Sequence, residues 1–332
     1  LLKLFFGSIA DDVMAAGLIY LRITALSFPF IALYNAGAAI FRSVGNSKVS
    51  MQVSLWMNGI NVAGNALCVF VLKMGVAGVA VPTLVSRAVA AVMILTMASR
   101  KGQELTLDAS SLYPIDRQVM GKILRIGIPS ACENSFFQFG RLLVVSMIAL
   151  FGTTQTSANA VANNLDSVGT VVGQAMGLAM VTVVGQSVGA GDKEQATFYL
   201  KKVMKWSIVA LGAVNLMIIL FLNPLIGLYR SLTPQTVELT RTLVLIHSTA
   251  VIFMWAFSFV LPNAFRAAND VQFTMWVGMG SMLVFRVGVS WILCVHLGWG
   301  AVGVWTAMIL DWVCRISFFL PRALTGKWLS KI

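Results

Sequence analysis

Long apolar segments separated by short polar connections dominate this chain. After an apolar stretch at about residues 1–10, nine segments follow that are each long enough to cross a hydrocarbon core of about 30 Å as a helix. Helices are expected because backbone groups in lipid must hydrogen-bond within their own segment. The predicted spans are 18–40, 49–72, 77–99, 122–151, 157–190, 198–222, 240–264, 271–296 and 300–322. The pattern predicts an all-α polytopic membrane protein.

The composition excludes a soluble protein. Of the 332 residues, 58% are hydrophobic and 11% are charged, whereas soluble domains average about 45–50% apolar and about 25% charged residues. So few charges cannot cover so much apolar surface in water. Globular soluble, disordered and disulfide-scaffold classes are therefore excluded.

The basic residues are unevenly distributed. The chain has 24 Lys and Arg against 12 Asp and Glu, and fifteen of the basic residues lie at 42–48, 100–125, 193–205, 266 and 322–331. Every second connection is thus basic, which is the positive-inside pattern and places these stretches and the C-terminus in the cytoplasm. Because nucleic-acid binding needs one continuous basic patch, no nucleic-acid partner is expected.

Short motifs recur at a nearly constant offset, which indicates an internal repeat. Phe41-Arg42 recurs as Phe265-Arg266, and Gly75-x-x-Gly78-Val79 recurs as Gly300-x-x-Gly303-Val304. An even number of spans separates the two copies, so they are expected to be parallel repeats related by an axis along the membrane normal. If the second copy begins near Gly121, the first would begin about 100 residues before this chain. We therefore expect a fragment lacking about three spans of a twelve-span protein.

Ionisable residues inside apolar segments are candidates for function, because inserting each one costs a few kcal/mol. Glu133 lies one turn after Pro129, which frees backbone carbonyl groups, and Asn134 and Gln138 add amide oxygens. A carboxylate with neutral oxygens suits Na⁺, and a desolvated carboxylate suits a proton. We predict that Glu133, Asn134 and Gln138 bind a coupling cation; the alternative is a structural pair between Glu133 and Arg141.

A polar stripe runs along the predicted span 157–190. It consists of Asn159, Asn163, Asp166, Thr170 and Gln174, whose spacing of 4, 3, 4 and 4 residues puts them on one helical face. Because lipid would penalise such a face, we predict that Asn163, Asp166, Thr170 and Gln174 line a substrate cavity. Hydrogen bonding between helices without a ligand is the alternative. Glycines beside the stripe are expected to allow close helix packing.

Three further sets of polar residues lie within spans. Asn58, Asn61 and Asn65 share a helical face, and cavity and structural roles are equally favoured for them. Asp311 and Arg315 are four residues apart, as in a helical salt bridge, and are predicted to form a structural pair. Arg87 and Arg286 have no partner near them in sequence and stay unassigned.

The sequence carries no signature of an enzyme or of an ATP-driven pump. Its four Cys and two His are scattered, and neither a Ser/His/Asp arrangement nor a G-x-x-x-x-G-K-[ST] motif occurs. We expect no metal, cofactor or ATP, and a gradient of Na⁺ or H⁺ remains as the energy source. The expected partners are the lipid bilayer and small organic substrates, with the chain acting as a monomer.

Several segments, taken in order and spacing, resemble the multidrug and toxic compound extrusion (MATE) family over essentially the whole chain. They are Tyr20-Leu21-Arg22-Ile23, Phe41-Arg42-Ser43-Val44-Gly45-Asn46-Ser47-Lys48, Gly127-Ile128-Pro129, Val184-Gly185-Gln186 with Gly189-Ala190-Gly191-Asp192, and Phe265-Arg266-Ala267-Ala268-Asn269-Asp270.

The resemblance implies twelve helices in two six-helix lobes. Residues 1–99 would hold the end of the third helix and helices four to six, 100–121 a cytoplasmic linker, and 122–332 helices seven to twelve. It implies export of amphipathic or cationic organic compounds across the cell membrane by alternating access, in exchange for Na⁺ or H⁺. Glu133 matches an acidic cation-site position of the seventh helix. Some Na⁺-coupled members have an aspartate in the tenth helix, whereas residues 247–262 here contain no acid.

Two other functions stay open. A flippase or exporter of lipid-linked saccharides or metabolites with the same two-lobe architecture would need a basic cavity for phosphates, to which Arg87, Arg141 and Arg286 could contribute. A membrane-embedded enzyme or scaffold would need, for catalysis, a converging set of acids and a histidine, and the sequence shows none.

Overall fold

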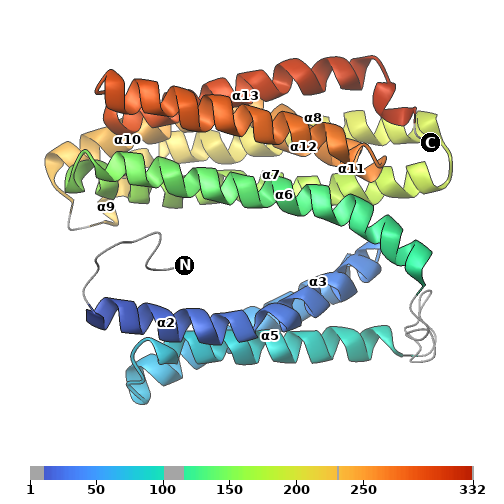
Figure 1. The fold of residues 1–332 in the computed structure, drawn as a ribbon, viewed down its shortest axis with the longest axis horizontal. Helices are drawn as coiled ribbons and strands as arrows, with labels where there is room; N and C mark the ends of the chain where they lie inside the picture. Colours follow the sequence, from blue (N-terminus) through green and yellow to red (C-terminus); the bar gives the residue numbers. More distant parts are fainter. Residues whose placement is uncertain (1–10, 101–115, 230–231, 331–332) are drawn as a thin grey trace. The chain divides into compact units, whose positions relative to one another are not determined.

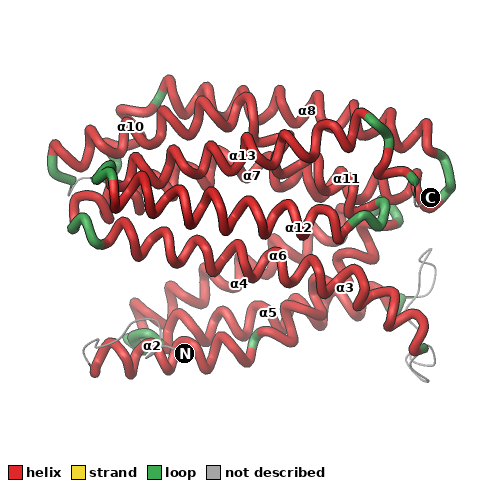
Figure 2. Tube along the Cα trace, turned by 45° about the horizontal axis from the view of Figure 1, so that its top comes forward, coloured by secondary structure: helices red, strands yellow, loops and turns green. Residues whose placement is uncertain are grey.

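The computed structural model describes residues 11–100, 116–229 and 232–330, and every regular element in these ranges is a helix (Figures 1 and 2). The apolar stretch 1–10 and most of the expected linker 100–121 lie outside the described residues. Eight of the described helices are long and apolar enough to cross a membrane. The chain is therefore an all-α polytopic membrane protein. It divides into two compact units, residues 1–115 (unit 1) and 116–332 (unit 2).

Within residues 11–100, unit 1 has four α-helices around a small apolar core. They are α2 (Asp11–Leu26), α3 (Phe28–Ser43), α4 (Ser47–Ala66) with its π-helical continuation η1 (Leu67–Val71), and α5 (Ala77–Ala98). Phe41 of α3, Val53 of α4 and Ile94 of α5 meet in the core.

The single helix expected at 18–40 is wrong in detail, because Ser27 separates α2 from α3. Pro29 lies in the first turn of α3, where its missing N–H costs nothing, but it cannot continue the hydrogen bonds of α2. Ser27 is fully buried, and its hydroxyl donates to the Thr24 carbonyl at 2.6 Å. The two helices together still make one membrane-crossing segment.

Unit 2 is a bundle of longer helices that lie side by side in both views (Figures 1 and 2). Its elements are α6 (Arg117–Ala149), α7 (Thr153–Gly189), α8 (Lys193–Leu220), α9 (Leu222–Gly227), α10 (Pro234–Ala250) continuing through η3 (Val251–Val260) into α11 (Leu261–Ala267), α12 (Val271–Ser281) continuing through η4 (Met282–Val289) to η5 (Ile292–His296), α13 (Gly300–Leu324) and the short η6 (Lys327–Leu329). Leu211, Leu243, Phe265, Trp312 and Phe319 are among its largest buried side chains.

Each of the nine segments expected from the sequence corresponds to a helical segment, but one differs in character. Helix α6 has 33 residues, which is ample length, yet it is not among the eight apolar spans. It carries four basic residues and Glu133. It also begins at Arg117, inside the expected linker, because Asp116 caps its first turn by accepting hydrogen bonds from the amides of Gln118 and Val119.

The two copies of the repeated motifs share their local geometry. The Asn46 amide donates to the Phe41 carbonyl at 2.9 Å, and the Asp270 amide donates to the Phe265 carbonyl at 2.8 Å, so both arginine motifs end a helix in the same way. Gly75 and Gly300 have φ of 58° and 56°, a conformation that favours glycine. Gly78 and Gly303 each lie against the backbone of a preceding π-helical end. The repeat seen in the sequence is thus also a repeat of structure.

Candidate functional site

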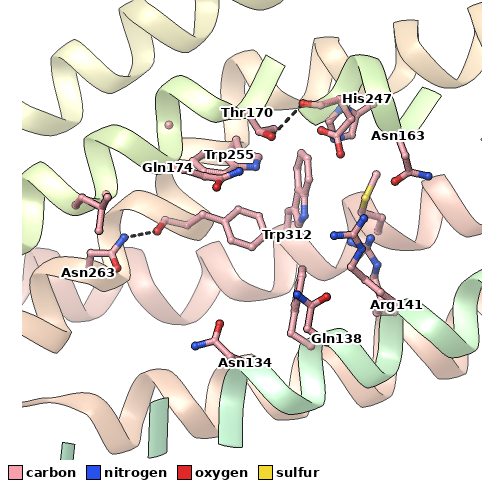
Figure 3. A pocket seen from close by; sticks show the side chains of 18 residues that line it. Asn134, Gln138, Arg141, Asn163, Thr170, Gln174, His247, Trp255, Asn263 and Trp312 are labelled. Carbon is pink, nitrogen blue, oxygen red and sulfur yellow. Dashed lines mark hydrogen bonds and ion pairs between the residues drawn. The ribbon is translucent and has the colours of Figure 1, made fainter. Parts of the chain in front are cut away.

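Unit 2 contains a cavity of about 580 Å³ between α6, α7, α10, η3, α11, η4 and α13 (Figure 3). This volume lies within the range typical of small-molecule sites. The lining residues are Asn134, Phe137, Gln138, Arg141, Asn163, Asp166, Thr170, Gly173, Gln174, Gly177, Leu178, His247, Trp255, Phe259, Asn263, Arg286, Met308 and Trp312. The cavity therefore combines aromatic rings, amides and a few ionisable groups.

Helix α6 contributes a polar edge to the cavity. Asn134, Gln138 and Arg141 are spaced by four and three residues and therefore project from one face (Figure 3). The Asn134 side-chain amide donates to the Ser130 carbonyl at 2.9 Å, which leaves its oxygen available. Arg141 is exposed and makes no hydrogen bond or ion pair with the described residues.

Helix α7 contributes the polar stripe found in the sequence. Asn163, Asp166, Thr170 and Gln174 all line the cavity, as their common face predicts (Figure 3). Asn159 does not line it: it is 6% exposed, and its side-chain oxygen accepts a hydrogen bond from Trp305 Nε1 of α13 at 3.0 Å. The stripe thus holds α7 to α13 at one end and faces the cavity along the rest.

Glycines on α7 make room for two side chains that line the cavity, Trp255 and Asn263. A Cβ on Gly173 would lie 2.2 Å from Cζ3 of Trp255, and a Cβ on Gly177 would lie 2.7 Å from Nδ2 of Asn263. Trp255 lies in η3 and stacks at a tilt on Phe259, with ring centroids 5.0 Å apart. Because π-helical turns recur at functional sites, this part of the long helix is a natural place for a binding surface.

Asp166 faces His247 of α10, a residue to which the sequence analysis assigned no role. Nε2 of His247 lies 3.1 Å from Oδ1 of Asp166, but not in hydrogen-bonding geometry, so this oxygen has no donor among the described residues. His247 is buried edge-on against Trp305 and Trp312. The rule that marks ionisable residues inside apolar segments would have found His247.

Arg286 of η4 also lines the cavity, which gives this unassigned residue a place. Its Nε is buried and makes no hydrogen bond within the described residues. Its guanidinium lies 5.8 Å from the ring centroid of Phe137. Arg286 and Arg141 both interact electrostatically with Asp166.

Glu133 lies in a smaller pocket of about 130 Å³ next to this cavity. Its Oε1 accepts a hydrogen bond from Arg266 Nη2 at 2.7 Å, whereas Oε2 is buried without a partner among the described residues. The structural pair considered in the sequence analysis, Glu133 with Arg141, is therefore wrong: tertiary packing supplies Arg266 instead. Asn134 lines both pockets, while Gln138 lines only the larger one.

The expected pair of Asp311 and Arg315 lies inside unit 2. Nε of Arg315 is 3.2 Å from both carboxylate oxygens of Asp311, and the side chains are 5% and 0% exposed. Arg315 also donates to the Gly278 carbonyl at 3.2 Å. With these bonds the pair joins α13 to α12.

Asn61 and Asn65 of α4 form a small network with Thr83 of α5, whereas Asn58 bonds within α4. Asn61 donates to the Thr83 hydroxyl at 3.1 Å, Asn65 donates to the Asn61 side-chain oxygen at 3.2 Å, and Asn58 donates to the Ser54 carbonyl at 2.9 Å. Arg87 donates to the Ser27 hydroxyl at 2.7 Å.

Metal chemistry finds no support in the described residues. No three His, Cys, Asp or Glu side chains gather there as a metal site. Cys68, Cys132, Cys294 and Cys314 are all free.

Comparison with known proteins decides the family. A model of the MatE family matches residues 1–67 and 129–292. The chain belongs to this family. MATE proteins are multi-pass membrane transporters of the multidrug efflux type, so the chain is a transporter and not an enzyme.

Individual relatives agree with this membership. The uncharacterized transporter YisQ of Bacillus subtilis is 26% identical, with 98% of this chain and 70% of the relative covered. The probable multidrug resistance protein NorM of Thermotoga maritima is 27% identical, with 97% and 70% covered. The fold matches a crystal structure of MATE in complex with MaL6 with a TM-score of 0.88 at 20% identity, covering 99% of this chain and 74% of that chain.

Proposed function

We propose that this MATE protein is a secondary active antiporter that exports amphipathic organic compounds in exchange for Na⁺ or H⁺. The observation that carries the proposal is the unit 2 cavity, which has the volume of a small-molecule site and joins aromatic faces to polar groups. The rings of Trp255, Phe259 and Trp312 would take the apolar part of a compound, and the stripe on α7 would take its polar part. The protein would act as a monomer, with its C-terminus in the cytoplasm.

Glu133 is the residue that we propose binds the coupling ion, together with Asn134; Gln138 lines only the larger cavity and is no longer included. Arg266 now neutralises one carboxylate oxygen, while the other is buried and unpartnered. An incoming Na⁺ or proton would replace Arg266 as the partner of the carboxylate. Asn134 lines both the ion pocket and the larger cavity, so it offers a direct link between ion binding and compound binding.

An alternative is the flipping or export of a lipid-linked saccharide. Arg141 and Arg286 line one cavity, and two cations favour a phosphate-bearing ligand. Arg87, the third arginine considered for such a site, lies in unit 1 and donates to the Ser27 hydroxyl. The cavity volume of about 580 Å³ suits a small compound better than a saccharide on a lipid carrier.

A transport assay with the full-length protein in proteoliposomes tests the proposed function. Vesicles would be loaded with a fluorescent amphipathic compound and given a Na⁺ gradient, a pH gradient or neither. We expect one of the two gradients to drive movement of the compound opposite to the ion, above the rate in protein-free vesicles. Equal rates with and without both gradients would contradict the proposal.

A further inference from the structure

Arginines inside unit 2 differ in whether they have an acidic partner. Arg266 pairs with Glu133, Arg315 with Asp311, and Arg322 with Asp270. Arg141 and Arg286, by contrast, have no carboxylate within ion-pair distance among the described residues, and both line the cavity.

Arg286 has an unmet hydrogen bond at the cavity. Its Nε is buried and has no acceptor in the described part of the chain. Leaving a buried charged donor unpaired is costly, because the group has lost its water without gaining a partner. An anionic oxygen at this position would supply the missing acceptor.

The charges that line the cavity do not balance. The titratable groups on it are Arg141 on α6, Asp166 on α7, His247 on α10 and Arg286 on η4. With His247 neutral, two cations face one anion, and the cavity is left with one positive charge. Asp166 interacts electrostatically with both arginines without pairing with either. A simple cation would meet net repulsion here, whereas an anion would be attracted.

The rest of the cavity suits an apolar body attached to such an anion. Trp255, Phe259 and Trp312 line the cavity from η3 and α13, while the two arginines come from α6 and η4 (Figure 3). The guanidinium of Arg286 lies over the ring of Phe137, 5.8 Å from the ring centroid. Aromatic faces and guanidinium groups thus line the same partly open cavity.

We propose that the compound bound in this cavity is an amphipathic organic acid, whose anionic group is held by Arg141 and Arg286 and whose apolar body packs on the aromatic rings. The inference rests on the proposed function, because it names the class of exported compound. A carboxylate and a phosphate monoester share the required chemistry, and the test below separates them.

Equilibrium dialysis of the purified full-length protein against matched naphthalene probes tests the inference without any ion gradient. The probes are naphthalene-2-acetate and 2-naphthyl phosphate as anions, naphthalene-2-acetamide as the neutral compound, and 2-(naphthalen-2-yl)ethylamine as the cation. We expect at least one anion to bind about tenfold tighter than the amide and the amine, a difference of about 1.4 kcal/mol. Comparing the affinities of the two anions shows whether the cavity prefers a carboxylate or a phosphate group.

Dialysis with variants of the cavity residues then tests whether the preference for anions arises in the cavity. R286Q and R141Q should each bring anion binding down to about the affinity of the amide measured in the same variant; R141Q is the safer variant for folding, because Arg141 is exposed. D166N should act in the opposite direction and strengthen anion binding, because it removes the competing carboxylate. R241Q is the matched control, since exposed Arg241 bonds to Asn223 outside the cavity.

Two results would overturn the inference: anion binding that is absent or no tighter than binding of the amide and the amine, or an anion preference that survives in both R141Q and R286Q. Each result would leave gradient-driven export of other compounds intact, so failure of this inference is distinguishable from failure of the proposed function.

Discussion

Glu133 and Arg266 lie 133 residues apart in the chain, yet Nη2 of Arg266 is 2.7 Å from Oε1 of Glu133. Their side chains are 11% and 27% exposed, so the pair is largely removed from water. Arg266 also donates to the Asn263 side-chain oxygen at 2.9 Å. This contact joins α6 to α11 beside the cavity. It also means that the carboxylate proposed to bind the ion is already paired with a cation of the protein.

A double-mutant cycle should show that this pair is coupled more strongly than a surface pair. For E133Q and R266M we expect a coupling of about 1–2 kcal/mol in unfolding free energy, against about 0–1 kcal/mol for exposed pairs. Denaturant unfolding of the purified protein in detergent measures it. Additivity of the two substitutions would show that the contact does not contribute to stability.

For the buried pair of Asp311 and Arg315, removing both charges should destabilise the protein less than removing one. D311N alone should destabilise the protein by about 3–5 kcal/mol, because it leaves the Arg315 charge buried without its partner. The double variant D311N/R315M should be less destabilised than D311N. Thermal unfolding followed by size-exclusion chromatography compares the two, and a double variant that is worse than the single would refute the argument.

Adding a single methyl group at Gly173 should weaken compound binding. In G173A the new methyl would overlap the Trp255 ring, so the ring must move within the cavity that it lines. We expect compound binding to weaken by about tenfold, or about 1.4 kcal/mol. G185A on the same helix is the control, because no atom lies within 4 Å of its Cβ position. Equal binding by the two variants would mean that the Trp255 position is unimportant.

The helices could be predicted from the sequence because the membrane imposes a simple rule. A segment such as 271–296 must be apolar over the full thickness of the hydrocarbon core, and the structure has a helical segment with these limits, from Val271 to His296. The stripe from Asn163 to Gln174 was predictable for a similar reason, since helical spacing alone fixes which side chains share a face. The break between α2 and α3 at Ser27 was not predicted, because it depends on the single residue Pro29 and not on the apolar pattern of the segment.

The partners of the ionisable residues could not be predicted in the same way. Spacing along one helix suggested Arg141 for Glu133, but the choice between Arg141 and Arg266 depends on how α6 packs against α11. Likewise His247 reaches Asp166 only through the packing of α10 on α7. Asp311 and Arg315 were predictable because they are one turn apart on a single helix.

Gradient-driven transport by E133Q in proteoliposomes tests the central claim most directly. The control is E238Q, which changes an exposed glutamate of α10 in the same way. If Glu133 binds the coupling ion, E133Q should lose gradient-driven transport while still binding compound, and E238Q should transport normally. Undiminished gradient-driven transport by E133Q would contradict the account.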